Sequence, residues 1–230
     1  MMQSLIAILA ATLCQDDLAA AAKKTSELTS YAFKVEIKAD GKGQKAPNYE
    51  GRFEKEKPLS LKVDGAEVFK KTGGVIVIKE GEAWKRLVKP PKGEKAARGE
   101  VSVQTIQGIK VPADELDGFE KCFEKSEKSA DGELTLFAGT LTPEGARSLV
   151  STGGKKEGKA AANLTYSGGA KVWVNKDGLV VKYEISVKSK GTVKEKEVEQ
   201  SITRTVTISE PGATKVEIPE GAQKALDSQA

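Results

Sequence analysis

The most restrictive absence in this chain is histidine, which occurs nowhere among its 230 residues. Without it there are no Ser-His or Cys-His catalytic pairs, no usual zinc sites and no histidine general base. No nucleophile-elbow, phosphate-loop, Ser-x-x-Lys or Cys-x-x-Cys pattern is present, and the Asp-Gly pairs lack the companion carboxylates of a calcium loop. We therefore expect a protein that is not an enzyme and that has no cofactor and no metal site.

Arginine is also scarce, since only five of the 37 basic residues are arginine and the others are lysine. Proteins that read nucleic acids usually rely on the planar arginine side chain. Lysine alternates with glutamate at residues 54–57 and 194–197, so the net charge of +4 forms no basic stripe. We expect a solvated surface of mixed sign and no nucleic-acid partner.

Cysteine occurs only twice, and the first cysteine ends an apolar run at residues 4–14. This run is too short to span a bilayer and is typical of the core of a signal peptide, although no Lys or Arg precedes it. We predict a signal peptide at residues 1–14 and a single mature domain at residues 15–230. Leu13 stands where a bacterial lipoprotein has a small residue before its acylated cysteine, so we expect a soluble, exported protein of the periplasm or cell envelope. The alternative is a buried N-terminal helix in a cytosolic protein.

What the sequence does contain is a series of segments in which apolar and polar residues alternate. The clearest example is residues 171–175 and 179–187 around the turn at 175–178, where Leu179, Val181, Tyr183, Ile185 and Val187 share one face. Further strands are predicted at residues 31–38, 49–55, 59–63, 66–70, 75–78, 83–88 and 133–141, and one that ends near 208. Helices are predicted at 16–30, with Asp16 as the cap, from about 112 to 123, and after 142. This order predicts an α+β protein with helices against one antiparallel sheet.

The apolar faces of these strands allow two interpretations. They form either a solid core under the helices, which is the default, or the wall of a lipid cavity if the helices stand off the sheet. Crowding by Phe33, Phe53, Trp84 and Phe137 would fill such a cavity. The candidate cavity residues are Phe33, Val35, Phe53, Leu61, Ile78, Val181, Tyr183 and Ile202.

Arg204 is unusual because it falls on the apolar face of its predicted strand, where an unpaired arginine would be costly. One interpretation is a rim position whose guanidinium reaches water or pairs with a glutamate. The other is a contact with a lid or with a ligand head group at the mouth of an apolar cavity.

Several short patterns occur in an order that resembles a known family. They are Leu-Thr-Ser-Tyr at 28–31, Gly51 in the second strand, Lys57-Pro58 after it, Glu-Gly-Glu-Ala-Trp at 80–84, Asp-Gly-Leu at 177–179 and Ile-Pro-Glu-Gly-Ala at 218–222. Together they cover nearly the whole mature chain. The sequence thus resembles the bacterial lipoprotein-carrier family, which comprises the periplasmic lipoprotein localization factors and related lipid-carrying lipoproteins of mycobacteria.

The resemblance implies an unclosed half-barrel, in which a curved antiparallel sheet wraps around a lid of helices and holds acyl chains in an apolar cavity. Carrier members of the family have an arginine before the proline after the second strand, and it secures the lid; this sequence has Lys57 there. The implied partners are lipid or lipoprotein acyl chains, with transient membrane or envelope-protein contact, and we expect a monomer. The alternative is a structural or interaction module of the cell envelope with the same fold and a filled core.

Overall fold

The computed structural model describes residues 2–40, 47–88, 102–150, 164–193 and 196–228. Within these ranges the chain forms strands and helices in an order that follows the sequence prediction. The strands are β1 (Ser30–Asp40), β2 (Tyr49–Glu54), β3 (Leu59–Val63), β4 (Ala66–Lys70), β5 (Ile76–Glu80), β6 (Ala83–Arg86), β7 (Phe123–Asp131), β8 (Leu134–Leu141), β9 (Leu164–Val174), β10 (Val180–Val193) and β11 (Lys196–Ser209). The helices are α1 (Met2–Ser26), α2 (Val103–Gly108), α3 (Pro112–Leu116), the short 3-10 helix η1 (Phe119–Cys122), α4 (Pro143–Val150) and α5 (Glu220–Asp227).

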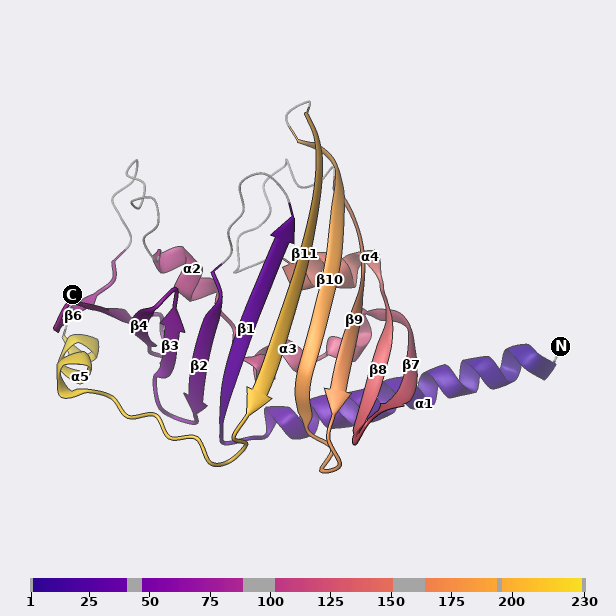
Figure 1. Cartoon of the computed structure of the whole chain (residues 1–230), viewed down its shortest axis with the longest axis horizontal. Helices are drawn as coiled ribbons and strands as arrows, with labels where there is room; N and C mark the ends of the chain where they lie inside the picture. The colour runs from indigo at the N-terminus through magenta and orange to yellow at the C-terminus, as the bar shows by residue number, and fades with distance from the viewer. Residues whose placement is uncertain (1, 41–46, 89–101, 151–163, 194–195, 229–230) are drawn as a thin grey trace.

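All the strands belong to one antiparallel sheet with the order β6-β5-β4-β3-β2-β1-β11-β10-β9-β8-β7. Neighbours in the sheet are consecutive in the chain except at the seam, where β1 pairs with β11. The sheet is curved and does not close into a barrel, because β6 and β7 remain as separate edges (Figure 1). The predicted α+β class and the predicted unclosed half-barrel are therefore confirmed.

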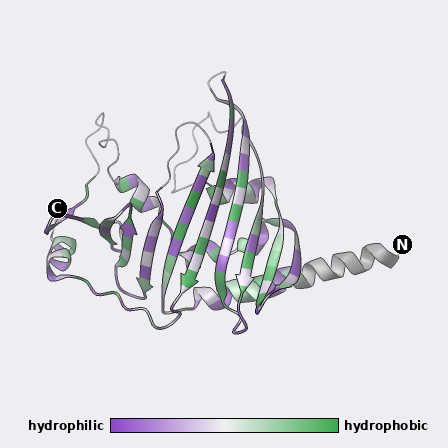
Figure 2. Ribbon diagram, viewed as in Figure 1, coloured by the Kyte–Doolittle hydropathy of each residue, from purple (hydrophilic) through white to green (hydrophobic). Residues whose placement is uncertain are grey.

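Helices α1, α2, α3 and α4 lie on one side of this sheet, which we call the inner face (Figure 1). The large hydrophobic core is formed where these helices meet the strands. In β1, Tyr31, Phe33 and Val35 are buried in this core, while Lys34 and Glu36 point to the outer face. The predicted alternation is confirmed there, and its stripes are visible along the strands in Figure 2.

The predicted face of β10 is wrong at its beginning. A bulge at Val181 shifts the register with β9, so that Val180 pairs with Val174 and Lys182 pairs with Trp173. Val180 is buried in the core, whereas Val181 is half-buried and does not belong to the core cluster. A bulge inserts one residue into the strand, and strict alternation in the sequence does not reveal it.

The strand β5 is apolar on both sides, yet it is next to the edge of the sheet and not central. Its Val77 faces a second, smaller cluster on the outer face, where the C-terminal segment with α5 packs. Trp84 belongs to this outer cluster and stacks near Phe69, with ring centroids 5.3 Å apart. Trp84 therefore does not fill the space under the inner helices, and α5 was not predicted from the sequence.

The helices also differ from the prediction. The first helix begins before Asp16, so this residue lies inside α1 and does not cap it. The helix expected at residues 112–123 is interrupted at Gly118, which adopts a left-handed conformation (φ 72°) that separates α3 from η1. Helix α2 and strand β7 were not predicted. Cys14 is buried within α1, and the division of the chain at residue 14 stays a prediction.

An aromatic ring of β1 lies directly against the backbone of β2 on the inner face. The ring of Phe33 lies over Gly51 on the neighbouring strand, and a Cβ at Gly51 would be 2.2 Å from this ring. A glycine here gives the aromatic ring the space that a side chain would take. At this position the inner face is therefore occupied by side chains of the protein.

Candidate functional site

The candidate site is the inner face of the sheet together with the short helices that cover it. Among the predicted cavity residues, Phe53 packs against the edge of the core, while Val181 and Ile202 are half-buried and outside the core cluster. The other predicted residues are buried together in one hydrophobic cluster: Phe33, Val35, Leu61, Ile78 and Tyr183. Phe137 is buried in the same cluster.

A cluster of four polar side chains lies within this apolar surface. We call this cluster the latch, and it consists of Glu115, Arg204, Tyr183 and Tyr49. The Arg204 guanidinium donates to one carboxylate oxygen of Glu115 and forms an ion pair with it. The Tyr183 hydroxyl donates to the other oxygen over 2.5 Å. The side chains of Arg204 and Glu115 are only 15% and 12% exposed, so this pair is largely removed from water.

The register of the sheet explains why the latch residues meet. Tyr49, Val35, Val206 and Tyr183 form one row across β2, β1, β11 and β10. Arg204 lies two residues before Val206 on the same face of β11, because side chains alternate along a strand. The two tyrosines therefore lie in the row next to that of Arg204 on the same face, and α3 brings Glu115 against Arg204 and Tyr183.

Helices α2 and α3 cover part of the inner face, and we call these two helices the lid. Polar contacts attach them to the sheet at two further points. The Tyr31 hydroxyl accepts a hydrogen bond from the Ala113 backbone N–H over 3.2 Å. The Lys70 ammonium donates to the backbone carbonyls of Gln107 and Ile109, over 3.1 and 2.8 Å, at the end of α2. A cation is favourable at the carboxyl end of a helix. The lid is thus attached through polar groups as well as through its apolar side chains.

Burial and the latch charges set the ionisation of the tyrosines on the inner face. Burial raises the pKa of Tyr183 well above its usual value, and the Glu115 carboxylate raises it further. Burial raises the pKa of Tyr49 to about 12, while Arg204 acts to lower it. Burial also raises the pKa of Tyr31, against the lowering effect of its hydrogen bond from Ala113. All three phenols are therefore neutral over the physiological range.

These pKa shifts predict a loss of stability at alkaline pH. Above about pH 10 the unfolded chain releases phenolic protons that the folded chain keeps on Tyr31, Tyr49 and Tyr183, so the free energy of unfolding falls as the pH rises. Tyr49 alone contributes a loss on the order of 2 kcal/mol by pH 12. Burial lowers the pKa of Lys70, and this shift makes the free energy of unfolding rise with pH, in opposition to the tyrosines. Lys70 is one group against three phenols, so we expect the loss of stability to prevail.

Urea unfolding between pH 8 and pH 11, followed together with tyrosinate absorbance, measures this effect. The folded protein should show fewer ionised phenols at pH 11 than the urea-unfolded protein. Equal absorbance in the two states, with no change in the unfolding free energy, would contradict the assignment of Tyr31, Tyr49 and Tyr183 as buried, neutral groups.

The structure does not bring Lys57 to the latch. Lys57 is exposed in the turn between β2 and β3, next to the row in which Glu54 pairs with Ser30. Arg204 pairs with Ile37 near the other end of β1. Glu115 was not among the site residues predicted from the sequence. The placement of an arginine on an apolar face signals that a carboxylate is nearby, but it does not say which of the acidic residues provides it.

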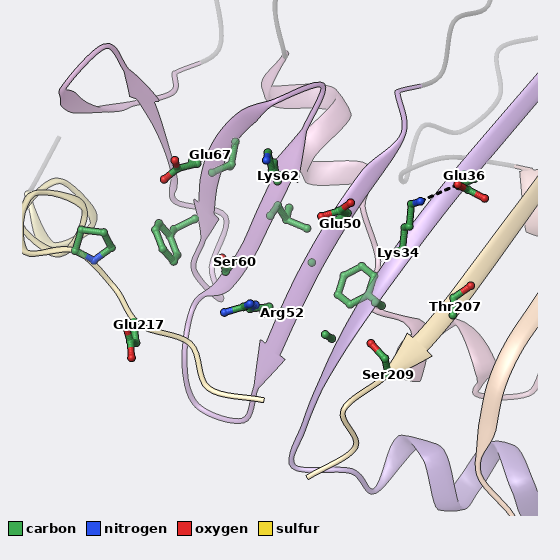
Figure 3. A pocket seen from close by; sticks show the side chains of 17 residues that line it. Lys34, Glu36, Glu50, Arg52, Ser60, Lys62, Glu67, Thr207, Ser209 and Glu217 are labelled. Carbon is green, nitrogen blue, oxygen red and sulfur yellow. Dashed lines mark ion pairs between the residues drawn. The ribbon is translucent and has the colours of Figure 1, made fainter. Parts of the chain in front are cut away.

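A groove of about 680 Å³ lies on the outer face, on the side away from the lid (Figure 3). It runs over β11, β1, β2, β3 and β4 and is bordered by Glu217 and Pro219 of the C-terminal segment. Its lining carries charges of both signs, including the Lys34–Glu36 ion pair of 2.9 Å. Arg52 lies in it between the small cross-strand neighbours Ala32 and Ser60. Because charged side chains of both signs line it, this groove is less suited to acyl chains than the apolar inner face.

The described residues also bear on two other features, a metal site and a membrane-spanning helix. In these ranges, no group of three or more His, Cys, Asp or Glu side chains is placed to hold a metal ion. None of the helices in the described part of the chain has the length and apolar character needed to cross a membrane.

Comparisons with known proteins add to the description of the fold. No protein-family model matches the chain, and no curated protein matches it in sequence. The solved structures that it resembles include LprF from Mycobacterium bovis, with a TM-score of 0.53 and 15% sequence identity over 92% of this chain and 98% of that chain. The lipoprotein LppX of Mycobacterium tuberculosis has a TM-score of 0.45 and 16% identity, over 87% of this chain and 97% of that chain.

A LolA superfamily protein from Nitrosomonas europaea is more distant, with a TM-score of 0.31 and 8% identity over 89% of this chain and 94% of that chain. The chain shares the fold of LprF over nearly its whole length, at 15% sequence identity.

Proposed function

We propose that this chain is an exported, non-enzymatic carrier of the cell envelope that binds lipid or lipoprotein acyl chains on the inner face of its sheet. In this proposal residues 1–14 are a signal peptide that is removed, and the lid of α2 and α3 separates from the sheet to admit the ligand. Arg204 is the residue of the sheet that holds the lid by an ion pair, beside the hydrogen bonds that the lid makes with Tyr183, Tyr31 and Lys70. The apolar residues under the lid, among them Phe33, Val35 and Tyr183, contact the acyl chains.

The observation that carries the proposal is the buried ion pair between Arg204 of the sheet and Glu115 of the lid. Burying two charges is costly, and replacing such a pair with apolar residues is often neutral or stabilising. A permanent core therefore gains little from this arrangement. A lid that has to come away from an apolar surface does gain, because in the open state both charged groups can be solvated again.

Acyl chains are suitable ligands for the surface that the open lid would expose. Each buried methylene contributes roughly 0.8 kcal/mol, so one long chain supplies useful affinity without a charged partner. The lid contributes apolar residues to the same cluster, including Val103, Ile106 and Leu116. An acyl chain that replaces these side chains would keep the inner face covered.

A second candidate function is a structural or interaction module of the cell envelope that has no ligand. The filling of the inner face supports it, since the Phe33 ring occupies the space over Gly51 and both Phe119 and Phe137 are buried. In this alternative the lid never opens, and the latch only fixes how α3 sits on the sheet.

Protein purified from its own host provides the first test, by native mass spectrometry combined with organic extraction. We expect a lipid to be retained, and we expect the emptied protein to take up a dansyl-labelled fatty acid. Repeated isolation without lipid under gentle conditions, together with no uptake of the labelled fatty acid, would favour the structural module and contradict the carrier.

A matched variant separates lid opening from simple surface adsorption. In the double variant Arg204→Met and Glu115→Leu, an apolar contact replaces the ion pair, and we expect the fold to be retained with stability equal to or above that of the wild type. Uptake of the labelled fatty acid should be slower than in the wild type because the lid is held more firmly. Equal uptake rates would show that the latch does not control access.

A further inference from the structure

We propose that the latch is an anion-binding site in which Glu115 takes the place of the anionic head group of a lipid ligand. This inference rests on the proposed carrier function and names its substrate class, which is amphiphiles with a carboxylate or phosphate head group. The ligand binds by exchange: its head group replaces the Glu115 carboxylate on the sheet, and the lid is thereby released.

The division of the latch between sheet and lid is the basis for this exchange. The donor groups come from the sheet, with Arg204 on β11 and Tyr183 on β10, and the acceptor comes from the lid. The two donors contact different oxygens of the same carboxylate. Charge-assisted hydrogen bonds of this kind are the strong ones, and arginine is well suited to bind carboxylates and phosphates.

Tyr49 adds a further polar group on the same inner face. It lies in the same cross-strand row as Tyr183, and both Arg204 and Glu115 act on it electrostatically. The Tyr49 ring also packs edge to face against Phe33, with centroids 6.4 Å apart. The site therefore has polar groups for a head group and, directly beside them, the aromatic surface on which an acyl chain would lie.

When the lid leaves, Glu115 leaves with it, and Arg204 remains on the apolar face without its partner. Covering this arginine with a neutral lipid would bury an unpaired charge, which is strongly unfavourable. An anionic head group restores the balance, because its oxygens can accept from Arg204 and Tyr183 as the oxygens of Glu115 do. The site therefore selects anionic amphiphiles over neutral ones.

The first experiment tests the anion site without any lipid. The variant Glu115→Ala removes the resident carboxylate, and acetate at 100 mM is added, with chloride at equal ionic strength as the control. We expect acetate to raise the thermal midpoint of this variant by about 3 °C more than that of the wild type. Phosphate is tested in the same way. The double variant Arg204→Met and Glu115→Leu should show no such gain, and an equal response of all three proteins would overturn the anion site.

The second experiment tests the exchange with amphiphiles. Binding of dansyl-undecanoic acid is compared with binding of its methyl ester, and we expect the acid to bind the wild type about tenfold more tightly. The double variant should bind both about equally. Displacement of the acid by oleate and by lysophosphatidate, measured separately, distinguishes carboxylate from phosphate head groups.

The two experiments separate the inference from the proposed function. Two outcomes would overturn the head-group inference and leave the carrier function in place. One is uptake of the acid and the ester with equal affinity; the other is uptake of amphiphiles by a protein whose Glu115→Ala variant shows no response to acetate. An acetate response with no uptake of any amphiphile would leave an anion site and overturn the carrier function. A preference for the acid that persists in the double variant would place the head group elsewhere and overturn the inference.

Discussion

Replacing Arg204 by methionine should lower the free energy of unfolding by about 3–5 kcal/mol, because the Glu115 carboxylate is then left in a largely buried place without its cation. Tyr183 still donates to this carboxylate, but a phenol does not neutralise its charge. Urea unfolding at pH 7 measures the change.

Two controls distinguish a latch effect from a general effect of losing an arginine. Arg52→Met removes an exposed arginine from the outer groove, where surface changes are expected to stay within about 0.5 kcal/mol. Adding Glu115→Leu to the Arg204→Met variant should restore the lost stability, to the level of the wild type or above it. A small effect of Arg204→Met, or no recovery in the double variant, would show that the ion pair is better solvated than its burial indicates.

Phe119→Ala should be similarly destabilising, with a loss of about 3–5 kcal/mol, because it removes a fully buried ring. Phe119 lies just after the lid and packs against Phe123 and Tyr183, with ring centroids 5.6 and 5.8 Å apart. Its loss leaves an apolar cavity beside the latch. Thermal and urea unfolding give the magnitude, and binding of benzene by the variant would report the cavity.

The conservative variant Phe119→Leu should recover more than half of this loss, since it restores most of the apolar contact. Val88→Ala is a suitable surface control, because Val88 is 67% exposed. If Phe119→Ala were no more destabilising than Val88→Ala, the region after the lid would have to be loosely packed, and the description of a closed inner face would be wrong.

Most of the strands could be predicted from the sequence because each has one buried and one solvated face. The alternation in β1 and β3 survives in the structure for this reason. β7 escaped prediction because it is an edge strand whose sequence is mostly charged and whose residues are mostly exposed. Local sequence also could not show that the distant C-terminal segment covers β5, which makes that strand apolar on both sides.

The candidate site was predictable only in part. The unusual placement of Arg204 on an apolar face was visible, because a strand has a period of two. Its partner was not, because α3 is five residues long and carries no helical stripe that fixes its orientation. The place of Tyr49 in the latch could not be predicted without knowing that β1 pairs with both β2 and β11. The pairing of β1 with β11 depends on contacts between residues far apart in the chain.

The seam between β1 and β11 has a consequence for the order in which the chain can fold. Each half of the sheet is a run of neighbouring hairpins, so β1 to β6 and β7 to β11 can each form from local contacts, which are fast. Joining them requires residues 201–209 to pair with residues 32–40, and this closes a loop of most of the chain. The latch is assembled from β2, α3, β10 and β11, so it comes into being only when the last strand is in place. Until β11 pairs with it, the first half of the sheet therefore keeps one edge of β1 unpaired.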